Sequence, residues 1–237
     1  IRIDDDGCIE PLSNFVSRVH QHGGKIIAQL VVMGSAILLP ETPEGERRFI
    51  FSPSGVTEKV GKWTQESQAL TVDQIHELTE AVAKAAARAK AAGFDGVQFH
   101  GAHGYLASKF LSPHFNTRTD AYGGSAENRA RFAVEAVRAV RSRLPELPID
   151  YKLAVRQEDP HYGNAGVVES ELGIFVPLLT DAGVTSFHVT LANHSSLEDT
   201  IPPANHPYFK EQGCFLKFCD EVRQYTDKPI TGVGGLN

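Results

Sequence analysis

The chain has 237 residues, of which 41% are hydrophobic and 22% are charged, and its formal net charge is −6. This composition is typical of a folded globular protein and excludes a disordered chain; a chain of this length can bury roughly 70–75% of its unfolded surface. The acidic balance, with no basic stripe, excludes a nucleic-acid binder. No apolar run approaches the ~18–20 residues that cross a bilayer. We therefore expect no nucleic-acid and no membrane partner.

The cysteines and the start of the chain bear on the cellular compartment of the protein. Cys8, Cys214 and Cys219 are few and follow no pattern, which is typical of reduced thiols in a cytoplasm. No signal peptide opens the chain, so we expect a cytoplasmic protein. The chain does not begin with Met, which suggests that it is part of a longer gene product.

The first third of the chain has one helix, one strand and a long irregular stretch. Residues 14–21 have apolar side chains at helical spacing, with Phe15 and Val16 on the inward face. A buried strand follows at 25–30. Residues 31–70 show little periodicity of either kind, and loops of that length usually surround a functional site.

The strongest helix signal begins at Thr71, which forms a predicted capping box with Gln74. This helix extends to residue 92, and Gly93 takes the position that ends it. Downstream, short β-branched runs alternate with helical patterns. The further predicted strands are 96–100, 149–155, 186–190 and 229–233, and the further predicted helices are 125–144, 169–181 and 208–225.

This order, a helix and then alternating strands and helices, predicts a parallel α/β sheet with right-handed crossovers. An open doubly wound sheet and a (β/α)8 barrel both fit. The dinucleotide-binding glycine fingerprint is absent, whereas Gln29, His100, Lys152 and Gly234 fall at the carboxyl ends of strands, where barrel enzymes place functional groups. We therefore expect a single (β/α)8 TIM-barrel domain over 1–237, with its first and last strands missing because five strands are found instead of eight.

The densest group of reactive side chains lies just after one of these strands, in the run His100-Gly-Ala-His103-Gly-Tyr105. Imidazole N–H groups there could donate to a carbonyl or phenolate oxygen, and the Tyr105 phenol would lie nearby. A zinc site and a merely polar loop are the alternatives. Two histidines three residues apart, without further ligands at suitable spacing, are weak evidence for zinc, so we expect no metal.

The segment from 93 to 132, GFDGVQFHGAHGYLASKFLSPHFNTRTDAYGGSAENRARF, closely resembles the signature of the Old Yellow Enzyme family of FMN-dependent NAD(P)H oxidoreductases. The resemblance extends from the helix before Gln29 to the glycines at 234 and 235. It implies an FMN-containing (β/α)8 barrel with NADH or NADPH as reductant. It also implies that this chain is the central part of such a barrel.

The resemblance gives roles on the substrate side of the cofactor to three residues. His100 and His103 match the pair that binds the electron-withdrawing oxygen of the substrate, and Tyr105 matches the proton donor. All three are therefore expected to be catalytic, and the two histidines to bind substrate.

Four further positions match residues that bind FMN. Gln29 matches the glutamine on the pyrimidine edge, where an amide can donate to O2 and accept from N3–H. Lys152 falls where the family has Arg or Lys, and its charge would stabilise the reduced flavin. Gly234 and Gly235 match the loop whose backbone N–H groups hold the phosphate.

Some signature positions are expected to be structural, and others depart from the family. We expect Arg118, Asp120, Arg129 and Arg131 to fix the loop after His103 through an Arg–Asp network. Where the family commonly has His and Arg after the glutamine, this chain has Val32 and Ser35. The flavin contacts of those two polar residues are missing, which indicates a divergent branch.

The resulting hypothesis is an enzyme that takes hydride from NAD(P)H and reduces an activated C=C, such as an α,β-unsaturated carbonyl, through bound FMN. Its partner is a small-molecule substrate, and a homo-oligomer is left open. The alternatives are a flavin amine dehydrogenase or an iron–sulfur dienoyl reductase on the same barrel, or a non-catalytic barrel fragment. A cysteine cluster after residue 237 would indicate the iron–sulfur enzyme.

Overall fold

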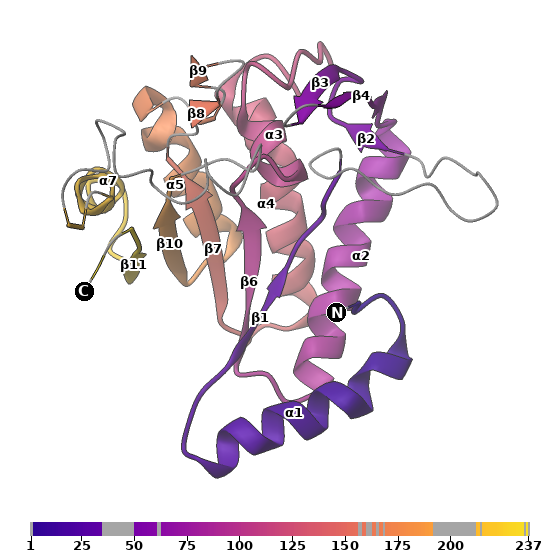
Figure 1. Cartoon of the computed structure of the whole chain (residues 1–237), viewed down its shortest axis with the longest axis vertical. Coiled ribbons are helices and arrows are strands. Elements are labelled where there is room, and N and C mark those ends of the chain that lie inside the picture. Colours follow the sequence, from indigo (N-terminus) through magenta and orange to yellow (C-terminus); the bar gives the residue numbers. More distant parts are fainter. Residues whose placement is uncertain are drawn as a thin grey trace.

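A five-stranded parallel sheet forms the centre of the computed structural model, in the order β1-β6-β7-β10-β11 (Figure 1). The described residues are 2–34, 50–60, 63–155, 158–159, 163–164, 166–167, 169–191, 212–213, 215–234 and 236. Apart from the small strands, neighbours in the sheet follow chain order, as expected for consecutive units of a (β/α)8 barrel. The strands are β1 (Ile27–Leu30), β6 (Gly96–Gly101), β7 (Ile149–Ala154), β10 (Ser186–Thr190) and β11 (Ile230–Gly232).

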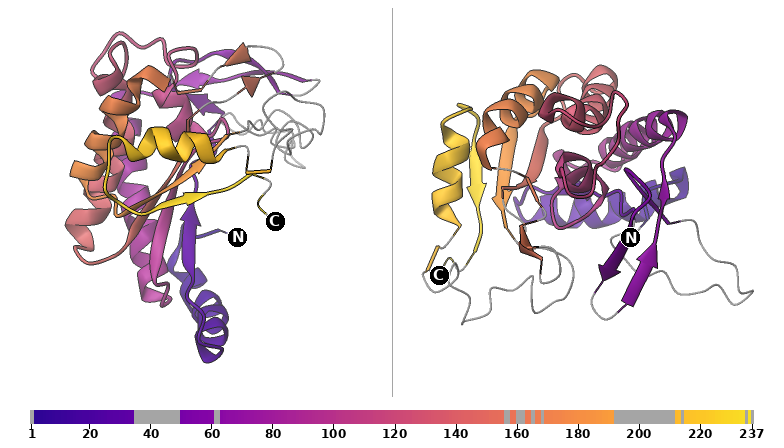
Figure 2. Two further views of the ribbon diagram at one scale, coloured as in Figure 1. Left: turned by 90° about the vertical axis from the view of Figure 1, so that its left-hand side faces the viewer. Right: turned by 90° about the horizontal axis from the view of Figure 1, so that it is seen from above.

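The crossover helices cover one face of this sheet, and seen from above they form an arc outside the strands (Figures 1 and 2). The opposite, concave face is formed by the alternate side chains of the same strands. The helices are α1 (Ile9–Gln21), α2 (Val72–Ala91), α3 (Leu106–Leu111), α4 (Ala126–Arg143), α5 (Leu172–Ala182) and α7 (Leu216–Arg223). In these ranges no helix is long and apolar enough to cross a membrane.

The local signals placed most elements correctly. The capping box before α2 is present, with the Thr71 hydroxyl accepting from the Gln74 amide at 3.2 Å and the Gln74 side chain accepting from the Thr71 amide at 2.9 Å. Gly93 ends the helix with φ 94°, a left-handed conformation that favours glycine. The predicted strand at 186–190 has the observed bounds.

Some short elements were missed, and some expected elements differ from those observed. Within 31–70, which was expected to be irregular, the described residues hold four short strands, and α3 and the hairpin of β8 and β9 were missed as well. Of the predicted helix at 208–225, the structure shows α7 from Leu216 to Arg223; residues 212, 213 and 215 lie in turns, and 208–211 and 214 lie outside the described residues. The short strands are β2 (Phe51–Ser52), β3 (Thr57–Val60), β4 (Trp63–Glu66), β5 (Gln68–Ala69), β8 (Glu158–Asp159) and β9 (Gly163–Asn164).

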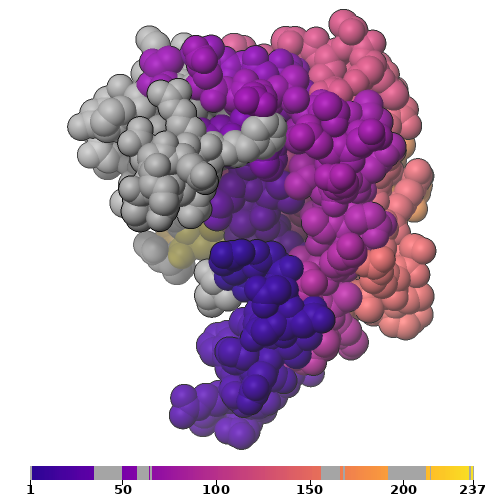
Figure 3. Space-filling view, turned by 90° about the vertical axis from the view of Figure 1, so that its right-hand side faces the viewer, coloured from indigo at the N-terminus to yellow at the C-terminus, as the bar shows by residue number. Residues whose placement is uncertain are grey.

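Helix α1 projects at one end of the molecule, next to α2 (Figure 3). It buries Leu12 and Val16, but Phe15, which was expected to face inward, is 52% exposed. Residues at i and i+4 share a helix face, so Leu12 and Val16 define the buried stripe and Phe15 falls beside it.

The main core lies between the sheet and its helices. Phe99, Tyr151 and Phe187 are adjacent in the sheet register and almost fully buried on the helix-covered face. Phe99 meets Phe132 of α4 edge-on, at 6.3 Å between ring centroids. Because side chains alternate along a strand, this core leaves the residues on either side of each aromatic pointing to the concave face.

Candidate active site

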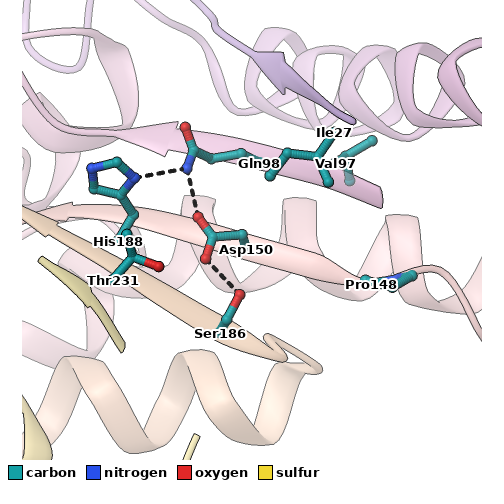
Figure 4. Close-up of a pocket in the computed structure, with 8 residues that line it drawn as sticks. All are labelled: Ile27, Val97, Gln98, Pro148, Asp150, Ser186, His188 and Thr231. Carbon is teal, nitrogen blue, oxygen red and sulfur yellow. Dashed lines mark hydrogen bonds between the residues drawn. The ribbon is translucent and has the colours of Figure 1, made fainter. Parts of the chain in front are cut away.

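The strand register arranges polar side chains on the concave face in two adjacent rows. The first row is Gln29, Gln98, Asp150 and Ser186, and the second is His100, Lys152, His188 and Thr231. Five of these residues line a pocket of about 310 Å³, namely Gln98, Asp150, Ser186, His188 and Thr231 (Figure 4), whereas Gln29, His100 and Lys152 are not among its lining residues. A polar barrel interior of this kind departs from the branched aliphatic layers usual in such barrels, which makes it a candidate site.

The predicted cluster after β6 is assembled as expected. The rings of His100 and His103 lie 5.0 Å apart and those of His100 and Tyr105 lie 4.7 Å apart, both edge-on. His100 is 3% exposed at the end of β6. The three side chains therefore form one contiguous group at the carboxyl end of the strand.

The backbone between β6 and α3 explains how three residues so close in sequence meet. His103 has φ 59°, the single positive value at a non-glycine residue in the described chain, and Gly104 has φ 73°. This reversal brings Tyr105 to the position that begins α3. The Leu106 amide donates to the Val32 carbonyl at 3.1 Å, which ties α3 to the segment after β1. A strained histidine kept in place by its surroundings is a common mark of a functional site.

Hydrogen bonds fix the roles of the two imidazoles. The Ala102 amide donates to His100 Nδ1 at 3.2 Å, so a neutral His100 carries its proton on Nε2. The Thr190 hydroxyl donates to the Leu191 carbonyl at 2.9 Å, and its oxygen can therefore accept from His103 Nε2, 3.3 Å away. A neutral His100 therefore has its donor at Nε2, and a neutral His103 that donates to Thr190 also carries its proton on Nε2.

Burial raises the pKa of Tyr105 above its usual value. The phenol therefore stays protonated at neutral pH, which is the state that a proton donor needs.

Lys152 faces the concave side from β7, where it pairs in register with His100 and with His188. Burial lowers its pKa, and the charge of Asp150 opposes that shift. Lys152 forms no ion pair with a carboxylate in the part of the chain that the structure describes. A half-buried cation that forms no ion pair among the described residues is suited to bind a negatively charged ligand.

The side chain of Gln29 also lies in this region, at the end of β1. Its Nε2 donates to Oε1 of Gln98, its register neighbour on β6. Gln98 in turn contacts Asp150 and His188 (Figure 4). Through Gln98, Gln29 therefore belongs to a larger polar network.

The glycine pair at the end of β11 is described only in part. Gly234 has φ 108°, and a Cβ there would lie 2.5 Å from the ring of Phe215 at the start of α7. This glycine is therefore needed for packing, whether or not it also binds a ligand. Gly235 and Ser35 lie outside the described residues.

Arg118 and Asp120 of the signature form a structural contact, as expected. Arg118 donates to both carboxylate oxygens of Asp120, and its Nη1 donates to the carbonyls of Pro53 and Leu70 at 2.6 Å each. The guanidinium holds the pKa of Asp120 below its usual value. These contacts join the loop after α3 to the segment after β2 and to Leu70, the residue directly after β5.

Arg129, on α4, joins the end of α3 to the residue that precedes α5. Its guanidinium donates to the carbonyls of Leu111 at 2.9 Å and Gly124 at 2.5 Å and pairs with Glu171, while the side chain is 5% exposed. Arg131 donates to the Ala121 carbonyl at 2.7 Å. The expected Arg–Asp network is thus limited to Arg118 and Asp120, because Arg129 is paired with a glutamate.

Sequence reasoning missed Gln98, Asp150, Ser186 and His188. Gln98 and Asp150 lie two residues before His100 and Lys152 on the same strands, and Ser186 and His188 occupy the same two levels of the next strand. The alternation of side chains along a strand could therefore have indicated them. Their mutual contacts depend on the register between strands, which a single sequence does not reveal.

Comparison with known proteins decides the family. The family model described as "NADH:flavin oxidoreductase / NADH oxidase family" matches residues 1–237. The chain belongs to this family. It is 47% identical over 226 residues to a bilirubin reductase of Clostridium symbiosum (strain WAL-14163), which covers 92% of this chain and 58% of that protein. The chain therefore spans less than two thirds of that relative's length.

Solved structures of the family share the fold. An old yellow enzyme homologue from Zymomonas mobilis superposes with a TM-score of 0.73 at 26% identity, covering 94% of this chain and 60% of that one. A morphinone reductase in complex with tetrahydroNAD gives 0.72 at 28% identity, covering 95% and 60%. The resemblance to the Old Yellow Enzyme family and the (β/α)8 class are confirmed, and the described strands form part of such a barrel.

Proposed function

We propose that the protein is an FMN-dependent oxidoreductase that takes hydride from NADH or NADPH and reduces an activated C=C. The observation that carries the proposal is the contact group of His100, His103 and Tyr105, beside Gln29 and Lys152, on one face of a flavin-oxidoreductase fold. Bound FMN would supply the transfer of hydride from the nicotinamide to the acceptor.

The residues on the concave face fit FMN. The flavin pyrimidine ring has carbonyl oxygens and an N3–H, and Gln29 keeps its Oε1 and one N–H beyond its contact with Gln98. Lys152 supplies a cation that forms no ion pair among the described residues, and its charge would stabilise the charge gained on reduction. Gly234 would contribute its backbone N–H toward the phosphate.

The histidines and Tyr105 suit an acceptor in which the C=C is conjugated to a carbonyl. His100 Nε2–H would donate to the carbonyl oxygen, and withdrawal of electron density makes the β-carbon electrophilic. The Tyr105 phenol, protonated at neutral pH, would deliver a proton to the α-carbon. These residues thus polarise the substrate at one end and protonate it at the other.

Bilirubin is a specific candidate acceptor, because the relative with 47% identity bears the name bilirubin reductase. Its carbon–carbon double bonds are conjugated to lactam carbonyls, so it belongs to the chemical class that this site would polarise. The small enone remains the general form of the proposal.

The test is anaerobic, with the purified protein. We expect FMN, not FAD, to be released on denaturation, NADH or NADPH to bleach the flavin, and an enone or bilirubin to restore its colour. A protein that stays colourless after FMN is added would overturn the proposal in favour of a non-catalytic fragment. Bleaching by an amine without NAD(P)H would overturn it in favour of an amine dehydrogenase.

A further inference from the structure

Asp150 lies within a relay of hydrogen bonds that crosses four strands, β10, β7, β6 and β1. It accepts from the Ser186 hydroxyl at 2.5 Å and from Gln98 Nε2 at 2.6 Å (Figure 4). Gln98 then accepts at Oε1 from Gln29 Nε2. Asp150 and Gln98 are 8% and 7% exposed, so solvent cannot readily replace these contacts.

The relay has a defined direction because a carboxylate can only accept. Asp150 requires Gln98 to present its NH2 group, and this turns Gln98 Oε1 toward Gln29. Gln29 must then present its own NH2 group to Gln98. Its Oε1 is left as an acceptor, so the charge of a residue two strands away determines how the Gln29 amide is oriented.

The same direction sets the tautomer of His188. Gln98 Nε2 lies 3.3 Å from His188 Nδ1, and because this nitrogen of Gln98 is a donor, His188 Nδ1 accepts and Nε2 carries the proton. Burial and the charge of Lys152 lower the pKa of His188, which favours this neutral form. His188 Nε2 is shielded from solvent and has no partner among the described residues.

We propose that Asp150 is a positioning residue for the flavin site: through Gln98 it holds the Gln29 amide with its Oε1 directed to accept the pyrimidine N3–H. This inference rests on the proposed function, since it assumes that Gln29 binds the pyrimidine edge. Without Asp150, Gln98 can rotate its amide, and Gln29 loses its fixed orientation.

The test compares the dissociation constants of FMN and of N3-methyl-FMN, which lacks the N3–H. The wild-type protein should bind the methylated analogue about tenfold more weakly, the usual effect of losing one hydrogen bond. In Asp150→Asn this ratio should fall below about threefold. A merely structural effect would weaken both ligands alike and leave the ratio unchanged.

A double variant that moves the carboxylate from position 150 to position 98 should restore the orientation of Gln29. In the double variant Gln98→Glu/Asp150→Asn, the new carboxylate at 98 accepts from Gln29 and from the new amide at 150. The direction toward Gln29 is restored, so the ratio should return to about tenfold, and this variant also decides the matter if Asp150→Asn fails to fold. Asp181→Asn, the same change on the exposed side of α5, is the control and should leave the ratio unchanged.

The outcomes separate the two proposals. If the wild-type protein does not bind FMN, the proposed function fails. If it binds FMN but Asp150→Asn keeps the tenfold ratio, or the double variant does not restore it, the positioning role of Asp150 is overturned and the proposed function stands. Equal binding of both flavins by the wild type also overturns the positioning role alone.

Discussion

The ring of Tyr151 on β7 occupies the space that a side chain at Gly101 on the neighbouring strand β6 would need. A Cβ at position 101 would overlap the hydroxyl and the ring of Tyr151. Gly101 ends β6, directly after His100, and pairs in register with Leu153 of β7. The absence of a side chain at 101 therefore lets β6 approach a fully buried aromatic ring.

Gly101→Ala should destabilise the protein by about 1–3 kcal/mol, the usual cost of overpacking a core, and should displace His100. Urea unfolding measures the first effect and FMN affinity the second. The double variant Gly101→Ala/Tyr151→Leu should recover part of the loss, because leucine lacks the outer ring atoms that the new methyl group meets. Additive effects of the two substitutions would show that the residues do not compete.

Tyr151→Phe should stabilise the protein by about 1 kcal/mol. The Tyr151 hydroxyl is buried and has no hydrogen-bond partner among the described residues, so it loses hydration without compensation. Burial raises its pKa, consistent with a phenol that never ionises in the folded state. The matched control is Tyr122→Phe, which removes a 2.8 Å hydrogen bond to Glu135 and should be destabilising. A loss of stability in Tyr151→Phe would indicate a hidden partner.

The elements that the sequence predicted well are those with local signals. Thr71 and Gln74 are neighbours in the chain, and their capping box needs no tertiary structure. Helix α3 was missed because six residues show less than two helical turns, and it depends on Leu106 and Phe110, which are fully buried by the rest of the fold.

The same distinction applies to the site. His100, His103 and Tyr105 lie within six residues, so the motif contains the whole cluster. In the relay, Asp150 and Gln98 are 52 positions apart in the sequence, and Gln98 and Gln29 are 69 positions apart. These contacts exist only because parallel pairing places the three residues at the same level of neighbouring strands. The expectation that Phe15 is buried was wrong for a related reason, since the packing of α1 against α2 decides which stripe of α1 is buried.

Arg129→Met should cost about 3–5 kcal/mol, because it leaves Glu171 and two carbonyl groups without their guanidinium. Arg131→Met is the control: its contacts to Ala121 and Asn128 are more exposed, and its loss should cost less than about 1 kcal/mol. Denaturant unfolding compares the two. Similar losses would mean that Arg129 does not have the structural role given to it here.

Lys152→Met should weaken FMN binding and slow flavin reduction by NAD(P)H, by about 2–4 kcal/mol if one preorganised electrostatic contact is lost. The apoprotein should become more stable. Burial lowers the pKa of Lys152 below its ordinary 10.5, so the folded chain binds this proton less readily than the unfolded chain. The unfolding free energy of the wild type therefore rises with pH between the lowered pKa and 10.5, and below that range the full cost of the buried charge persists.

Thermal unfolding of the apoprotein across alkaline pH and FMN titration test Lys152→Met together. Lys84→Met, on the exposed side of α2, is the control and should change neither quantity. Unchanged flavin affinity with raised apoprotein stability would place the Lys152 side chain away from the cofactor.

Tyr105→Phe should slow the reoxidation of the flavin by an enone but not its reduction by NAD(P)H. The ring should keep its place, because it packs edge-on against His100 and its backbone begins α3, so the substitution removes only the hydroxyl. Reduction by NAD(P)H needs no proton from this hydroxyl and should be nearly unchanged. Reoxidation by an enone should slow by ~10²–10⁴-fold, the usual contribution of a positioned general acid, whereas reoxidation by oxygen should be barely affected.

The pH dependence provides a second measurement on the same variant. Because burial raises the pKa of Tyr105 above 10, enone reoxidation by the wild type should stay constant through neutral pH and fall only above pH 10, as the phenol ionises. In Tyr105→Phe this alkaline fall should disappear. Stopped-flow traces of both half-reactions decide between the roles: equal slowing of both would make Tyr105 structural, and no slowing of either would show that enones are not the substrate.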